Sequence, residues 1–563
     1  MAVTDLLSPL VKLPLPLVIL VLPLVSVLAL LYTVQIYTTR RYHHSVQTIV
    51  GGSKKGPALI VPPKLPYRLP FLGQAQEWLS GRPGDFFGKV FAFHPRDTGA
   101  CTLLLGGETI HMLFSPLAVS ALLKDRNSGR DGFNMRIEER GLGVDRSDVV
   151  KYEGLGSEPD ETGLTVKQRQ EKMNHHYMME KTAVDGLTGK FLEVFKLKLE
   201  EEYDTLDAKE GKTVGLNRWL ISQMFPASTT SLFGSRALEV YPELQTDFFE
   251  FDRVILSLFF GLPRFLNRKA FEARDKVSKG MLKWQELMIK ESNGKPADPD
   301  GEVDWEPIWG SRLNRAKQMY YMSEGISVAG RAAFDLGVLF ALNSNSLPAA
   351  GWMLMHILDP KGDPTLLPRL LKELEAAEKP DGSFDIPTLV TLPLMQSVLH
   401  EVLRLYVDVL FTREITEDLK LPHNDGKQRI LFEKGSVIIA PTWLGHRDEG
   451  LWTSPPCNEF CADRWLRTDP ETGKQSFSTT GTAGKFFPFG GGRTMCPGRN
   501  FAKQEILASV ATVLTMFDFM PLGFVDAKGE AMDRFPTFRD GLLGSGIMAT
   551  DEDMKVKITR KMR

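Results

Sequence analysis

The residues most able to do chemistry lie in one run near the end of the chain, from Phe486 to Arg499. The run reads Phe-Phe-Pro-Phe-Gly-Gly-Gly-Arg-Thr-Met-Cys-Pro-Gly-Arg and holds a single cysteine, Cys496. Glycines let backbone N–H groups come close to a sulfur atom, and such hydrogen bonds stabilise a thiolate that binds a metal. The run therefore predicts a thiolate metal ligand. The alternative is a buried free cysteine in a glycine-rich turn.

The spacing within this run is F-x-x-G-x-x-x-C-x-G, counted from Phe489 to Gly498. A lone thiolate suits a haem-thiolate enzyme, because it pushes electron density onto iron and favours O–O cleavage. The pattern resembles the cysteine-loop signature of the cytochromes P-450. This resemblance implies that haem b is the cofactor and that Cys496 is its fifth iron ligand. It also implies that Phe489, Gly492 and Gly498 bind the cofactor.

The same resemblance implies cations that pair with the haem propionates. Family members often carry Arg or His two residues before the cysteine, but that position is Thr494 here and the cation is Arg493. Arg493 is therefore a candidate propionate ligand, and Arg413 resembles the family arginine that reaches a propionate. Further upstream, the alternatives of a propionate ligand and an ordinary surface or core residue stay open for His175, His176 and Lys181.

A second motif lies on a helical pattern before the cysteine. Glu401 and Arg404 are three residues apart, so they share a helix face and can pair. The segment Phe460–Trp465 follows, and it resembles the F-x-P-E-R-F element of the family with Ala462 in place of proline. The resemblance implies that Glu401, Arg404 and Arg464 form a buried structural network behind the haem.

The expected distal helix departs from the usual family pattern. Members usually carry an acid–alcohol pair there, whereas this chain has Asn345 and Ser346 followed by Pro348. Both polar residues are candidate catalytic groups, and the alternative is that they cap or line a kink at the proline. The N-x-x-P pattern resembles the branch with prostacyclin synthase and the cholesterol 7α- and sterol 12α-hydroxylases. The ending Gly544–Met548 resembles that branch too.

This departure leaves two reactions open. Asn does not ionise, so the usual titrating group for proton delivery to dioxygen is missing. A monooxygenase would then use the substrate's hydroxyl or an ordered water as proton relay. An isomerase or dehydratase would need no external dioxygen. The residues do not decide between them.

Composition limits the remaining function classes. The 563 residues carry a net charge of −2, which leaves no electrostatic footprint for nucleic acid. Four cysteines are too few and too scattered for a disulfide framework, which indicates a reducing compartment.

The N-terminal region predicts a membrane anchor. Leu13 to Val34 is almost wholly apolar and is long enough to span the hydrocarbon layer. The positive charges that follow it, at Arg40, Arg41, Lys54 and Lys55, place the rest of the chain in the cytosol. A proline-rich stretch, Pro62 to Gly73, cannot form a helix and resembles the hinge of microsomal family members.

These features predict three parts: a membrane anchor over residues 1–40, a basic and proline-rich hinge over 41–75, and one haem-thiolate catalytic domain over 76–563. The fold expected is mainly α with small β-sheets, the cytochrome P-450 fold, preceded by one transmembrane helix. Apolar periodicity predicts a helix over Lys167 to Phe195, and polarity predicts a surface loop over Asp145 to Gly163.

The sequence thus favours a membrane-bound haem-thiolate monooxygenase with a lipophilic substrate of the sterol or terpenoid kind, with secondary metabolism as one setting. The resemblance implies electrons from NADPH through a separate cytochrome P-450 reductase, with cytochrome b5 as a further donor. It also implies a single-pass location in the endoplasmic reticulum membrane. A non-catalytic haem electron carrier or sensor is the alternative of another class.

Overall fold

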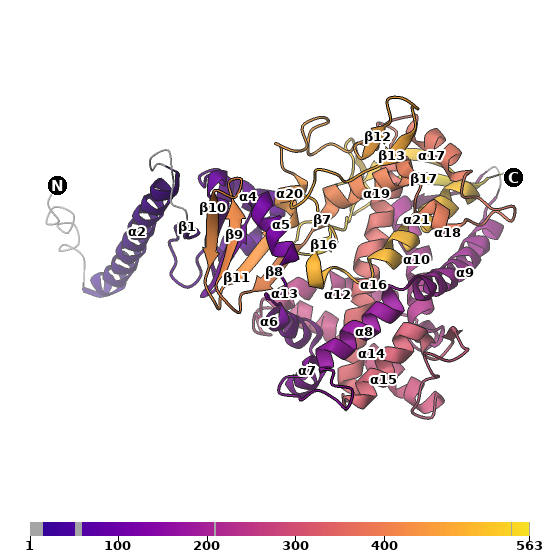
Figure 1. The fold of residues 1–563 in the computed structure, drawn as a ribbon, viewed down its shortest axis with the longest axis horizontal. Helices are drawn as coiled ribbons and strands as arrows, with labels where there is room; N and C mark the ends of the chain where they lie inside the picture. The colour runs from indigo at the N-terminus through magenta and orange to yellow at the C-terminus, as the bar shows by residue number, and fades with distance from the viewer. Residues whose placement is uncertain (1–14, 51–58, 208–209, 542, 562–563) are drawn as a thin grey trace. The chain divides into compact units, whose positions relative to one another are not determined.

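The computed structural model describes residues 15–50, 59–207, 210–541 and 543–561. The chain forms two compact units, which are Met1–Gly129 with Phe411–Pro441, and Arg130–Leu410 with Thr442–Arg563. Figure 1 shows the helices and strands along the chain.

The first unit holds helix α2 and two small sheets. One sheet has the strand order β1-β10-β9 and the other β2-β3-β11-β8. Its helices are α2 (Leu15–Val50), α3 (Ala75–Ser80), α4 (Pro83–Phe91), η2 (Arg96–Thr98) and α5 (Pro116–Lys124). Its strands are β1 (Leu59–Ile60), β2 (Ala100–Leu105), β3 (Glu108–Leu113), β8 (Leu410–Glu414), β9 (Leu419–His423), β10 (Gln428–Phe432) and β11 (Val437–Pro441).

Helix α2 contains most of the predicted membrane span and continues beyond it to Val50. Among the described residues, its segment Val21–Val50 is the one helix long and apolar enough to cross a membrane. The predicted start at Leu13 and the charges of Lys54 and Lys55 lie outside the described residues.

The second unit is mostly helical, and it carries the cysteine loop. Its helices before the distal region are α6 (Asp131–Arg136), η3 (Ile137–Leu142), α7 (Arg146–Glu153), α8 (Val166–Met178), α9 (Lys181–Thr205), α10 (Leu216–Phe233), α11 (Arg236–Val240), α12 (Leu244–Asp252), α13 (Ile255–Phe259), α14 (Arg268–Glu291) and α15 (Arg312–Ser323). Those that follow are α16 (Val328–Ile357), α17 (Leu366–Leu374), α18 (Ile386–Leu389), α19 (Pro393–Tyr406), α20 (Thr442–His446), η4 (Gly492–Thr494) and α21 (Arg499–Met516).

Short sheets complete this unit. The largest has the order β15-β14-β17-β4, and β7 pairs with β16. The strands are β4 (Lys212–Gly215), β5 (Trp305–Glu306), β6 (Gly310–Ser311), β7 (Val407–Asp408), β12 (Leu466–Thr468), β13 (Gln475–Phe477), β14 (Phe517–Val525), β15 (Ala531–Met532), β16 (Gly546–Ile547) and β17 (Asp553–Arg560). The predicted class, mainly α with small sheets, is confirmed.

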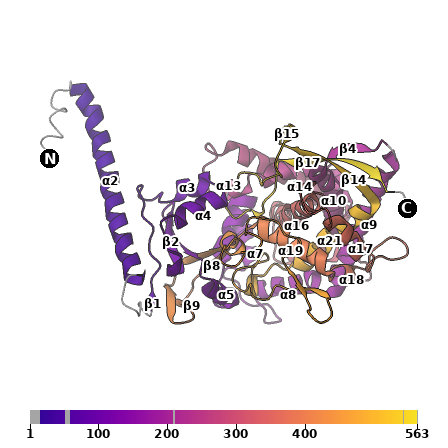
Figure 2. The same ribbon diagram turned by 90° about the horizontal axis from the view of Figure 1, so that it is seen from above.

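Helix α16 is the central element of the second unit. It packs against α10, α14, α19 and α21, and Figure 2 shows these helices gathered around it. Ser327 caps its N-terminus by accepting a hydrogen bond from the Gly330 N–H at 3.0 Å. Residues 347–355 of this helix are apolar and buried on every side, as expected of a helix surrounded by others.

One local prediction is confirmed and one was wrong. The periodic segment from Lys167 is helical, as predicted, and is divided into α8 and α9 because Glu180 takes an extended conformation (φ −69°, ψ 137°) between them. The polar stretch from Asp145 contains helix α7, because the Asp145 side chain caps it through the Ser147 N–H and Val149 is fully buried. A polar composition by itself does not distinguish a short capped helix from a surface loop.

Candidate functional site

The cysteine loop is a tight turn that ends at the N-terminus of α21. The Cys496 N–H donates to the Phe489 carbonyl at 2.9 Å. Gly490 and Gly492 have φ values of 72° and 60°, a left-handed conformation that favours glycine. Helix α21 begins three residues after the cysteine, so the turn presents the thiol at a helix N-terminus, where a negative charge is stabilised.

The Cys496 thiol has the surroundings that a thiolate ligand needs. Its side chain is free and the residue is exposed. Although the residue keeps exposed surface, the protein packed around it partly removes water from the thiol and so raises its pKa; hydrogen bonds from the Gly498 and Arg499 N–H groups and the Arg499 charge oppose that rise. Donors that favour the anion suit a sulfur held by a metal. The donor set therefore fits a haem iron.

The other predicted loop residues lie around this thiol. Phe489 is half-buried and packs against the hydrophobic core. A Cβ on Gly498 would lie 3.4 Å from Met178 Cε and 4.0 Å from the Cys496 sulfur. A large side chain there would press on the sulfur. Gly492 opens the short helix η4.

The two arginines predicted at the propionates have other partners here. Arg493 donates from Nε and Nη2 to Glu171 Oε1 on α8, at 2.9 and 2.8 Å. Arg413 belongs to the first unit, where it is buried and its guanidinium lies 3.9 Å from the centre of the Phe411 ring. A propionate contact stays a prediction for both.

The predicted histidines face carboxylates on the surface. His176 Nδ1 lies 3.0 Å from Glu180 Oε2, and His175 Nδ1 lies 3.8 Å from Glu180 Oε1. Lys181 bonds to Asp185. Their surroundings match the alternative of ordinary surface residues.

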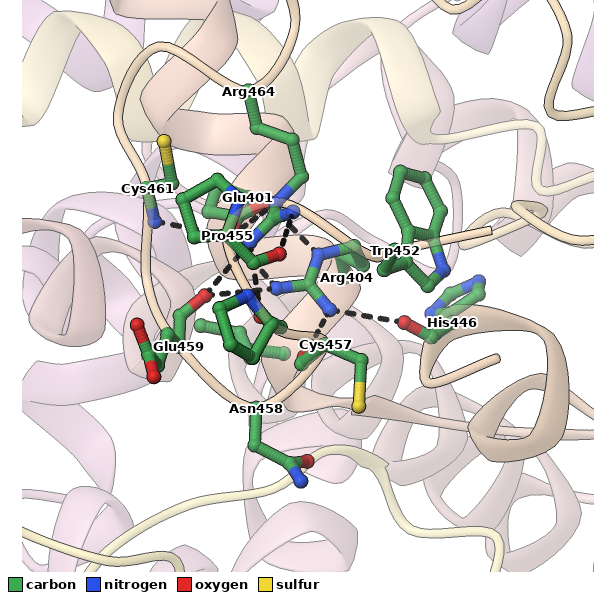
Figure 3. Close-up of polar contacts among 12 residues, drawn as sticks. Glu401, Arg404, His446, Trp452, Pro455, Cys457, Asn458, Glu459, Cys461 and Arg464 are labelled. Atoms are coloured by element: carbon green, nitrogen blue, oxygen red, sulfur yellow. Dashed lines mark hydrogen bonds and ion pairs between the residues drawn. The ribbon is translucent and has the colours of Figure 1, made fainter. Parts of the chain in front are cut away.

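The structure brings Glu401, Arg404 and Arg464 together (Figure 3). Arg404 forms a two-point ion pair with Glu401, with Nη2–Oε1 at 2.7 Å and Nε–Oε2 at 2.9 Å. Arg464 Nε reaches Glu401 Oε1 at 2.9 Å. The side chains of Glu401 and Arg404 are fully buried, and such charges are tolerated only when they are paired and hydrogen-bonded.

Backbone carbonyls satisfy the rest of this network, as Figure 3 shows. Arg404 also donates to the carbonyls of His446 at 3.1 Å and Glu459 at 3.2 Å. Arg464 donates to the Pro455 carbonyl at 2.7 Å. The network thus ties helix α19 to the segment that precedes the cysteine loop.

Sequence reasoning missed His446, which links the network to the cysteine loop. Its Nε2 accepts a hydrogen bond from the Phe487 N–H at 3.1 Å, and its carbonyl accepts from Arg404. Burial and, to a lesser extent, the Arg404 and Arg447 charges lower the pKa of His446 to about 3, so the ring is the neutral acceptor that this bond needs. Its only sequence signal was a histidine between two predicted motifs.

The structure separates the two distal candidates. Asn345 Oδ1 accepts a hydrogen bond from the Ile547 N–H at 3.0 Å, next to β16. Ser346 is buried and faces the Glu505 carboxyl on α21. Consecutive residues of a helix point about 100° apart, so the two side chains serve different neighbours. Asn345 remains a candidate for distal chemistry, whereas Ser346 lies among the core helices.

Glu505 is a second residue that sequence reasoning missed. It is fully buried and accepts a hydrogen bond from the Ser228 hydroxyl on α10. Burial raises the pKa of Glu505 from its ordinary 4.5 to about 7, although the Ser228 and Ser346 hydroxyls oppose this. The carboxyl therefore joins α10, α16 and α21 through a group that titrates near neutral pH.

The Glu505→Gln variant should lose one pH-dependent contribution to stability. The folded state holds the Glu505 proton up to about pH 7 and the unfolded state only to about 4.5. The free energy of unfolding should therefore fall by about 3 kcal/mol from this group as pH rises through that window. Urea unfolding at pH 5 and pH 8 measures the fall in both proteins. An equal fall in the variant would contradict the assignment.

Three comparisons place the chain among known proteins. The model of the family Cytochrome P450 matches residues 335–532. Cytochrome P450 monooxygenase calL of Penicillium decumbens is 29% identical over 475 residues, 81% of this chain and 85% of that protein. Cholesterol 7-alpha-monooxygenase of Cricetulus griseus is 27% identical over 372 residues, 62% of this chain and 66% of that protein. Among solved structures, the cytochrome P450DA heme domain matches with a TM-score of 0.58 at 15% identity, covering 89% of this chain and 98% of that one.

Proposed function

Because this chain belongs to the cytochrome P450 family and is similar in sequence to cholesterol 7-alpha-monooxygenase, we propose that it is a membrane-anchored monooxygenase of lipophilic substrates of the sterol or terpenoid kind. It is an oxidoreductase of this family and takes its electrons from a redox partner. One observation carries the proposal: the Cys496 thiol lies at the start of α21, with the Gly498 and Arg499 N–H groups as donors to its sulfur and the Arg499 charge nearby.

The roles of the residues follow from their contacts. The Cys496 thiolate would hold the haem iron, and the haem would supply dioxygen activation with electrons that arrive one at a time from the redox partner. Gly498 and Arg499 stabilise the thiolate by hydrogen bonds, and the Glu401–Arg404–Arg464 network holds the cysteine loop from behind through His446. Asn345 holds a carboxamide beside β16 that can orient a substrate oxygen.

Helix α2 supports the membrane anchor. Its 36 residues extend about 54 Å at 1.5 Å per residue, beyond the roughly 30 Å of the hydrocarbon layer. Leu24, Leu28 and Leu30 are each more than half exposed, so lipid would cover them. With Arg40 and Arg41 on the cytosolic side, the catalytic unit would face the cytosol from the endoplasmic reticulum membrane.

Deletion of residues 1–50 should release the protein from membranes. The full chain is expected in the membrane pellet after alkaline carbonate extraction, and the shortened chain in the supernatant, because the exposed leucines of α2 are removed. A matched control replaces only Arg40 and Arg41 with alanine. Recovery of the full chain in the carbonate supernatant would contradict the proposed membrane anchor.

The reaction itself is tested with labelled dioxygen. Membranes that contain this chain and a cytochrome P-450 reductase are incubated with cholesterol and a triterpenoid mixture, under ¹⁸O₂ and with NADPH. The proposal predicts NADPH-dependent products that carry one ¹⁸O atom. Products formed at the same rate without NADPH and without label would instead establish the isomerase or dehydratase. If no product forms while the reduced carbon monoxide complex shows the red-shifted Soret band of a thiolate-bound haem, the proposed substrate class is refuted.

A further inference from the structure

The C-terminal segment Gly544–Met548 is held at nearly every residue. In β16, Gly546 and Ile547 pair with Asp408 and Val407 of β7. The Met548 N–H donates to the Tyr406 carbonyl at 2.8 Å, and the Met548 carbonyl accepts from Trp352 Nε1 at 2.7 Å. Trp352 lies on α16 and stacks on the Tyr406 ring at 3.9 Å. The segment is therefore fixed between α16 and the strand that follows α19.

Asp408 adds a side-chain contact to this pairing. Its Oδ2 accepts a hydrogen bond from the Gly544 N–H at 2.8 Å, and the residue is fully buried. Its Oδ1 has no hydrogen-bond partner among the described residues. A buried carboxylate oxygen without a partner is unfavourable for stability. The contact that the Asp408 side chain does make is to the Gly544 backbone of the held segment.

The held segment in turn orients Asn345. The Ile547 N–H requires an acceptor, so the carboxamide oxygen of Asn345 faces it. The Asn345 Nδ2 group does not take part in this bond. Gly546 has φ 98°, and a Cβ there would lie 2.5 Å from Asn345 Oδ1. Only glycine allows this close approach. Asn345 is half-buried, and its side-chain hydrogen bond to Ile547 uses only Oδ1, so Nδ2 is not committed by that bond.

We propose that Asp408 is a positioning residue for substrate recognition. It fixes the segment Gly544–Met548, so that the Ile547 N–H bonds to Asn345 Oδ1. Asn345 then acts as a hydrogen-bond donor through Nδ2. This proposal rests on the proposed function, because Nδ2 can recognise a substrate only if the substrate binds beside Asn345. The ligand group that Nδ2 suits is an acceptor oxygen, such as a hydroxyl or ketone of the lipophilic substrate.

Hydrogen–deuterium exchange of the haem-loaded protein tests the positioning. Asp408→Ala should speed exchange of the Gly544–Met548 amides by about fivefold or more, the effect of one lost hydrogen bond. Asp408→Asn keeps an acceptor oxygen for Gly544 and should restore protection. Asp526→Asn, in the exposed turn between β14 and β15, is the matched control. Unchanged exchange in Asp408→Ala would overturn the positioning role, and if that variant does not fold, faster exchange in Asp408→Asn would overturn it.

The donor role is tested separately at Asn345. Asn345→Asp keeps an oxygen for the Ile547 N–H but replaces the Nδ2 donor with a second acceptor. Protection of Ile547 should persist while the ratio of products from the sterol and triterpenoid mixture changes, or product formation is lost. An unchanged product ratio would overturn the donor role. In both experiments the reduced carbon monoxide spectrum is recorded. A wild-type protein without the thiolate band refutes the proposed function, whereas an intact band with unchanged exchange refutes only the positioning.

Discussion

Replacing Cys496 with serine is expected to abolish the red-shifted Soret band of the reduced carbon monoxide complex and to reduce turnover below detection. The proposed metal ligand is the Cys496 thiolate, and a serine hydroxyl does not ionise at neutral pH. The Gly498 and Arg499 donors would then face a neutral oxygen in place of an anion. Difference spectroscopy of the membranes measures the band.

Cys461→Ser is the matched control for this prediction. Cys461 is a free, half-buried cysteine whose backbone N–H, and not its thiol, donates to Glu401 Oε1 at 3.1 Å. That variant should keep the band at its full height. A normal thiolate band in Cys496→Ser would refute the ligand assignment and, with it, the proposed reaction.

Arg404→Leu is expected to lower the free energy of unfolding by about 3–5 kcal/mol, because it strands the Glu401 carboxylate in the interior. Arg404 and Glu401 are both fully buried, so water cannot replace the lost partner. The variant should also retain less haem, because Arg404 bonds to the His446 carbonyl and His446 bonds to the cysteine loop. Urea unfolding and the haem-to-protein absorbance ratio measure the two effects.

Arg268→Leu is a matched control on the surface. Arg268 pairs with Glu272 on α14, where both side chains are at least half exposed. Such a pair contributes about 0–1 kcal/mol. Equal destabilisation by the two substitutions would show that Arg404 acts through general packing and not through its buried charge pair.

Much of the site could be predicted from short-range patterns. The cysteine loop is local: its glycines, its proline and the start of α21 lie within a few residues, so the turn follows from the residues themselves. Glu401 and Arg404 are one helical turn apart, and their pairing follows from helix geometry once α19 forms. The partners of their remaining donors are backbone carbonyls, which carry no sequence signal.

Less of the distal side could be predicted, because its contacts join distant parts of the chain. Asn345 and Ser346 were adjacent candidates, yet one bonds to β16 and the other faces α21. Asp408 had no motif, and its role depends on a strand that pairs with it from near the C-terminus. Likewise, helix α7 depends on a cap and one buried valine within a polar stretch.

The sequence by itself was enough to predict the haem-thiolate chemistry, because the cysteine loop and the Glu401–Arg404 motif before it are short local patterns that resemble those of the family. Only the tertiary structure decided how Asn345 is oriented. The hydrogen bond that sets its amide joins residues 202 positions apart, and its donor lies in β16, which pairs with β7. Local patterns specify turns and helix faces. Which atom of a side-chain amide is left to bind a ligand depends instead on the distant backbone group that bonds to its other atom.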